Sequence, residues 1–123
     1  MRALVVFMLL AGAAQAETIE GRWRVAALEP LVLTEGDSIE LTLVEGRISG
    51  NAGCNRFSAS YTMDTGMVIG PIASTRMLCH GRAGEVEAAV LHALPSVTGW
   101  RLVEGALELL AGEAVALRAL PIE

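Results

Sequence analysis

Apolar and polar residues alternate with a period of two along most of this chain. Trp23, Val25 and Ala27 fall on one face of an extended segment, and the arginines between them fall on the other face. The alternation returns in residues 39–43, 47–50, 57–62, 67–69, 100–103, 107–110 and 114–118. Turns that contain glycine separate these segments, as at Glu45-Gly46. The pattern predicts seven or eight short strands.

One segment has a helical period instead. Its apolar residues are spaced three or four apart, at Val86, Ala89, Val90, Ala93 and Leu94. This spacing predicts a single amphipathic helix at about 82–94, which Pro95 ends. We expect Glu85 and Glu87 to lie in its first turn, where carboxylates favour the helix dipole.

Many short strands and one helix indicate a mainly β protein. We expect an antiparallel sheet that curls into a small barrel. The helix would cover an open edge or end of this barrel and limit edge-to-edge pairing between molecules.

The first sixteen residues have the pattern of a signal peptide. Arg2 is followed by an apolar stretch, and Ala14-Gln15-Ala16 is typical of a cleavage site before Glu17. Ala13 stands where a lipoprotein would carry its lipidated cysteine. We therefore expect a soluble periplasmic or secreted protein, not a lipoprotein, with residues 17–123 as one domain and no membrane anchor after cleavage.

The composition excludes some classes of partner. The 123 residues include nine arginines, no lysine and fourteen acidic residues, which gives a net charge of −5. Cleavage would also remove the positive charge of Arg2. Nucleic acids and anionic membranes are bound by basic surfaces, so neither is expected as a partner. We also expect a monomer.

The only two cysteines lie in two distinctive segments. Cys54 lies in residues 50–57, GNAGCNRF, and Cys79 ends residues 75–79, TRMLC. Gly53 and Asn55 suit an irregular backbone around the first cysteine. An even number of cysteines in an exported chain favours a structural disulfide, Cys54–Cys79. A labile redox pair and two free thiols remain as alternatives.

The sequence contains no convincing catalytic or metal site. Cys79-His80 could form a thiol nucleophile, but adjacent residues of an extended segment point to opposite faces and a disulfide would consume the sulfur. A copper site would use soft ligands from Met63, Met67, Met77, Cys79, His80 and His92. Met63 and Met67 flank a hairpin turn, where methionine is more often a core residue. We therefore predict no catalytic residue, no metal ligand and no cofactor.

Three polar residues beside the cysteines form a possible binding surface, namely Asn55, Arg56 and Arg76. The alternative is structural. In that case Asn55 satisfies backbone groups at the bend and Arg56 pairs with a carboxylate.

Several of these residues also carry a resemblance to a known family. The blocks in residues 50–57 and 75–79, together with Trp23, Tyr61, Glu87, Leu94 and the strand at 107–109, resemble the META domain, the family of the bacterial heat-shock protein HslJ. The resemblance implies a lipocalin-like (HslJ-like) β fold over residues 17–123. It also implies a disulfide between the two motif cysteines.

Family members are linked to stress tolerance, secretion, motility and virulence, without an established biochemical activity. The resemblance therefore implies a non-enzymatic protein that acts in envelope stress response or assembly by binding a protein or a small ligand. The alternatives are a small-ligand carrier that uses the barrel interior and a periplasmic copper-handling protein.

Overall fold

The computed structural model describes residues 18–123, so the predicted signal peptide at 1–16 lies outside the described residues. The strands are β1 Gly21–Leu28, β2 Glu40–Val44, β3 Arg47–Asn51, β4 Arg56–Thr62, β5 Val68–Ile69, β6 Ala73–Ser74, β7 Gly99–Val103, β8 Ala106–Ala111 and β9 Ala114–Pro121. The helix α1 spans Gly81–Ala93, and the 3-10 turn η2, Leu94–Ser96, follows it. Within the described part, no helix is both long and apolar enough to cross a bilayer.

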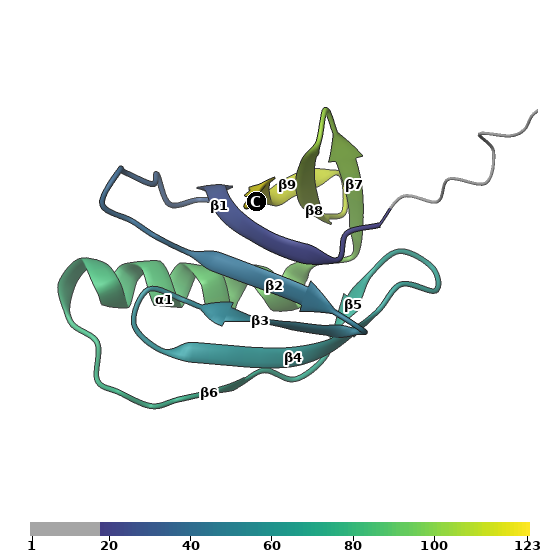
Figure 1. The fold of residues 1–123 in the computed structure, drawn as a ribbon. Helices are drawn as coiled ribbons and strands as arrows, with labels where there is room; N and C mark the ends of the chain where they lie inside the picture. The colour runs from purple at the N-terminus through teal and green to yellow at the C-terminus, as the bar shows by residue number, and fades with distance from the viewer. Residues whose placement is uncertain (1–17) are drawn as a thin grey trace, which may run out of the picture.

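The strands form one antiparallel sheet in the order β5-β4-β3-β2-β1-β9-β8-β7, and β6 pairs separately with β4 (Figure 1). Two hairpins are closed by Glu-Gly turns, in which Glu45 and Glu104 and the glycines after them have positive φ. Two consecutive residues with positive φ match the right-handed twist of paired strands. The mainly β fold with one helix is confirmed.

The two ends of the sheet meet near the start of β5. The Met67 N–H donates a hydrogen bond to the Thr98 carbonyl, at 3.0 Å, just before β7 begins. A Cβ at residue 66 would collide with the same carbonyl oxygen, so the close approach requires Gly66. The curled sheet therefore encloses an interior, as the sequence predicts.

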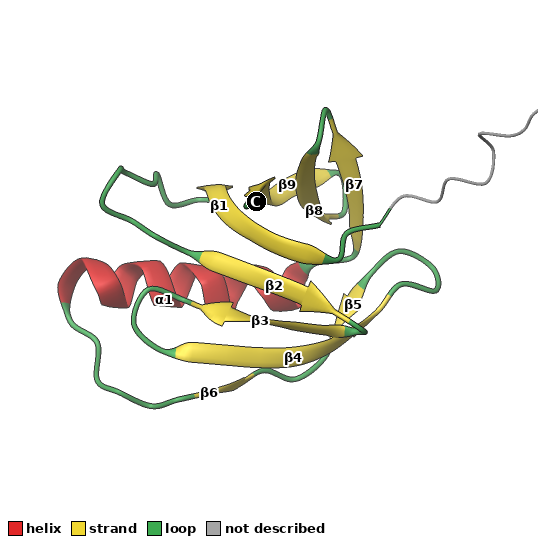
Figure 2. Ribbon diagram, viewed as in Figure 1, coloured by secondary structure: helices red, strands yellow, loops and turns green. Residues whose placement is uncertain are grey.

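One hydrophobic core fills that interior. Alternate residues of the strands face inward, including Trp23, Leu41, Ile48, Phe57, Leu107 and Leu117. The helix crosses behind β2 and β3 in Figure 2, and its buried residues Val86, Val90 and Ala93 belong to the same core. The helical period therefore predicted the buried face correctly.

Two details of the sequence prediction are wrong. Ala27 is exposed and Leu28 is buried, because a bulge between Val25 and Ala27 shifts the pairing of β1 with β9 and reverses the alternation. The helix begins at Gly81, so Glu85 and Glu87 lie beyond its first turn, which contains no acidic residue. The helix dipole therefore does not explain either carboxylate.

Candidate functional site

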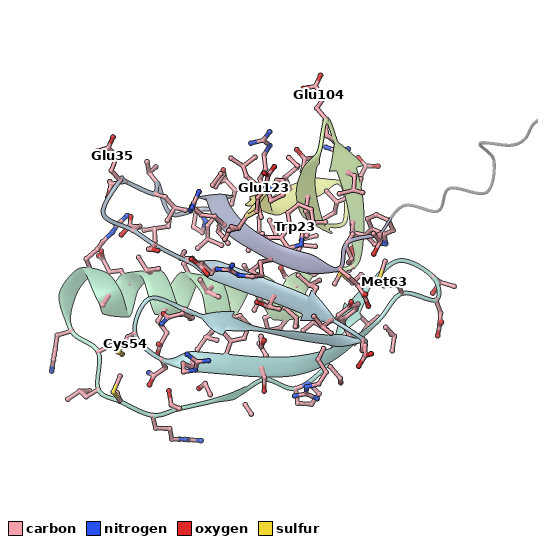
Figure 3. The ribbon with its side chains drawn as sticks, in the orientation of Figure 1. Trp23, Glu35, Cys54, Met63, Glu104 and Glu123 are labelled. Atoms are coloured by element: carbon pink, nitrogen blue, oxygen red, sulfur yellow. A yellow bond between two sulfur atoms is a disulfide. The ribbon has the colours of Figure 1, made fainter. Side chains whose placement is uncertain are left out.

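The two cysteines form the disulfide Cys54–Cys79, with a Cα–Cα distance of 6.1 Å across 25 residues of sequence. Cys54 lies in the loop between β3 and β4 (Figure 3), and Cys79 lies just before the first residue of α1, Gly81. The bond therefore joins the sheet to the start of the helix. Because the sulfur of Cys79 is bonded to Cys54, it is not a free thiolate that the adjacent His80 could activate as a nucleophile.

The backbone at Cys54 is irregular, as the sequence indicates. Gly53 has a φ of 100°, and its N–H donates to the Asn51 side-chain oxygen at 2.8 Å. A Cβ at residue 53 would press against Val86 of the helix at 3.1 Å. Glycine thus permits both the positive φ and the close approach of α1 to this loop.

Asn55 connects the first cysteine loop to the second. Its side chain is buried, with the residue only 3% exposed. The Oδ1 atom accepts hydrogen bonds from the Thr75 hydroxyl and the Met77 N–H, both at 2.8 Å. The Nδ2 atom donates to the Met77 carbonyl at 3.1 Å and to Glu87 Oε2 at 2.9 Å. One side chain therefore fixes both backbone groups of Met77.

Glu87 completes this arrangement from the helix. Its Oε1 atom accepts the Asn55 N–H at 2.7 Å, so the two carboxylate oxygens bind the backbone and the side chain of one residue. Cys79 Sγ lies 3.3 Å from Asn55 Nδ2. We call Asn55, Thr75, Met77, Cys79 and Glu87 the Asn55 cluster. The expectation that Glu87 acts through the helix dipole is therefore wrong, because its carboxylate binds Asn55.

The cluster presents an exposed extended segment, residues 75–79. Met77 is 62% exposed and Leu78 is 82% exposed. Arg56 and Arg76 also lie on the surface, whereas Asn55 lies beneath it. Of the three residues predicted for a binding surface, the structure thus leaves the two arginines accessible. In the described part of the chain, neither has a carboxylate within 4.0 Å, so the expected ion pair of Arg56 is not formed.

A second polar contact holds the loop before β2 against the start of α1. Arg82 donates to both oxygens of Asp37, with the shortest distance 2.6 Å, and to the Val32 carbonyl at 2.7 Å. Thr34 N–H also donates to Asp37, at 2.8 Å. These hydrogen bonds, that from Arg82 above all, hold the pKa of Asp37 well below its ordinary value. The sequence offered no signal for this pair, whose members are 45 positions apart.

The metal hypothesis receives little support from the geometry. Ligand atoms of Cys54, Cys79 and Glu87 lie within 4.8 Å of one another, but the two sulfurs are bonded to each other and offer no thiolate. Among residues 18–123, neither histidine belongs to a group of three that could share an ion. Met67 is a core residue, as the alternative interpretation of the methionines holds.

The interior offers no support for a carrier either. The inward-facing side chains of the described strands pack into one cluster. Hollows of about 230–650 Å³ are present, but they open on the outside of the sheet and helix. The largest lies beside the β8–β9 turn and the C-terminal end of α1.

Solved structures with the same fold include an NMR structure of a protein from Burkholderia xenovorans. It is 23% identical to this chain, with a TM-score of 0.64, and the match covers 91% of this chain and 97% of that chain. A second NMR structure is also 23% identical, with a TM-score of 0.62 and coverage of 82% and 89%. Comparison with curated proteins gave no match.

The family resemblance is tested separately by a family model. The model for the META domain matches residues 16–121, which include both cysteine segments and all nine strands described here. This chain therefore belongs to the META domain family.

Proposed function

We propose that this protein is exported and acts in the bacterial envelope, in stress response or assembly, as a non-catalytic domain that binds another protein. Membership of the META family supports a non-catalytic protein with a stress-related or envelope-associated role. The pattern of residues 1–16 supports export. Detection of a periplasmic form that begins at Glu17, by mass spectrometry, would test this part of the proposal.

The observation that carries the binding function is the 75–79 segment. Two adjacent apolar side chains, Met77 and Leu78, point into solvent, where they cost hydrophobic free energy unless a partner covers them. The segment is also held at two positions. The disulfide ties down Cys79, and the Asn55 amide holds the backbone of Met77. A surface that is already ordered loses little conformational entropy when it binds.

Site-specific crosslinking tests this surface in the cell. A photo-reactive residue placed at position 78 should form a discrete adduct with an envelope protein after irradiation. The matched control carries the same group at position 68, because Val68 on β5 is 62% exposed but lies away from the disulfide. Adducts that are absent at position 78, or identical at both positions, would contradict the proposal.

A further inference from the structure

The backbone of residues 73–78 has two different sides. Ala73 pairs with Ser58 of β4, and the Thr75 N–H donates to the Arg56 carbonyl at 3.0 Å. Met77 continues this pattern, since its N–H and carbonyl both bond to the Asn55 amide. In an extended chain, alternate residues direct their N–H and C=O groups to the same side. Residues 73, 75 and 77 therefore use the inner side.

The backbone groups of Ser74, Arg76 and Leu78 lie on the outer side of the segment. By the same alternation, their N–H and C=O groups point away from β4. Among the described residues, β6 pairs with no strand other than β4, and the N–H groups of Arg76 and Leu78 donate to no acceptor. A row of free backbone groups on an exposed extended segment is a template for one more strand.

Hollows lie on both faces of this edge, and Ser74 lines both of them. One, of about 410 Å³, lies between β6 and the C-terminal part of α1 and is lined mainly by apolar residues: Ile69, Pro71, Ile72, Leu91 and Pro95. The other, of about 400 Å³, lies over β3 and β4, and its further lining residues are Ser49, Arg56, Phe57, Ser58, Ala73 and Thr75. An added strand would direct alternate side chains toward the two hollows.

The charges indicate what those side chains are. Arg56 lines the second hollow, on the face that it shares with Thr75, whereas Arg76 lies on the edge itself. Both guanidinium groups lack a carboxylate partner within the described part of the molecule. Guanidinium groups bind carboxylates with two parallel hydrogen bonds, so acidic side chains complement this edge.

We propose that an extended segment of a partner protein adds as a strand along the outer side of residues 74–78. Its apolar side chains occupy the hollow beside Leu91, and its acidic side chains, at alternate positions, face Arg56 on the opposite face of the edge. This inference rests on the proposed binding function and specifies the partner as an extended peptide in which apolar and acidic residues alternate.

A displayed library of random decapeptides tests this specificity on the full oxidised protein. Selection should enrich sequences in which apolar and acidic residues alternate. One enriched peptide, made synthetically, should bind saturably. The same peptide with alternate backbone nitrogens methylated should bind at least about tenfold more weakly, because it cannot pair with the strand edge. Absence of enrichment over the bare support, or equal affinity of the methylated peptide, would overturn the inference.

A pair of variants separates backbone from side chain. Arg76→Pro removes an outward N–H but no inward hydrogen bond, whereas Arg76→Ala removes only the side chain. We expect the proline variant to bind the selected peptide about tenfold more weakly than the alanine variant, with the melting temperature checked for both. Equal affinities would count against strand addition. If crosslinking at position 78 nevertheless captures a partner, the binding function stands and only the strand geometry is wrong.

Discussion

Replacement of Asn55 tests whether one buried amide holds the two cysteine segments together. Asn55→Ala removes four side-chain hydrogen bonds, to Thr75, Met77 and Glu87, and a weaker fifth one to Cys79 Sγ. Each is worth about 0.5–1.5 kcal/mol net, and water can reach the exposed partners Thr75 and Met77, which lowers their share. We therefore expect the free energy of unfolding to fall by about 2–4 kcal/mol.

Urea unfolding followed by tryptophan fluorescence measures this change. The matched control is Asn51→Ala, because Asn51 is an exposed asparagine in the same region with one hydrogen bond, from the Gly53 N–H. The control should cost less than about 1 kcal/mol. If the two variants lost equal stability, or if Asn55→Ala lost less than about 1 kcal/mol, the assignment of Asn55 as the central contact would be refuted.

The Asn55→Asp variant tests the same contact through the pH dependence of its stability. The introduced carboxylate would face Glu87 and could no longer donate a hydrogen bond to it. Like charges at this distance raise the pKa of one member of the pair. The variant should therefore be less stable than Asn55→Ala at neutral pH and recover as the pH falls, because a protonated carboxyl group donates again. A stability difference that does not change with pH would contradict this.

Three further changes probe the parts that hold the site in place. Cys54→Ala should lower the stability of the oxidised protein by about 3 kcal/mol, and an unchanged urea midpoint would contradict a structural disulfide. Val90→Asp places a charge at a fully buried helix position and should cost more than about 3 kcal/mol, whereas the exposed control Ala88→Asp should cost little, as thermal melting would show. Asp37 has a depressed pKa in the folded state. Its ionised form therefore contributes fully to the free energy of unfolding above the ordinary carboxyl pKa, and this contribution is lost as the pH falls below that value. Asp37→Asn should therefore lose less stability between neutral and strongly acidic pH than the wild type. If the free energy of unfolding fell equally with pH in both proteins, the contact with Arg82 would be contradicted.

The fold could be predicted from the sequence wherever one periodicity continued without interruption. The alternation at Leu41 and Leu43 placed both side chains in the core, and the spacing of Val86 and Val90 gave the buried face of the helix. The prediction was wrong at Ala27, where the bulge depends on how β1 pairs with β9, far away in the sequence. Strand β6 was missed because two residues are too few to establish a period.

The site was only partly predictable for a similar reason. The two cysteine segments stand out by their composition, and their pairing follows from the parity of the cysteines. The role of Glu87 does not follow from its neighbours, because its partner Asn55 lies 32 positions earlier. Asn55 itself was expected either at a binding surface or as a satisfier of backbone groups. Its burial and its bonds to Met77 match the second interpretation.

Amide hydrogen exchange measured by NMR tests the central claim most directly, namely that the Asn55 cluster and the disulfide hold residues 75–79 extended with one side bonded and the other free. In the oxidised protein, the N–H groups of Thr75 and Met77 should exchange slowly, because both are hydrogen-bonded inward. Those of Arg76 and Leu78 should exchange rapidly. Uniformly rapid exchange across the segment would contradict the account.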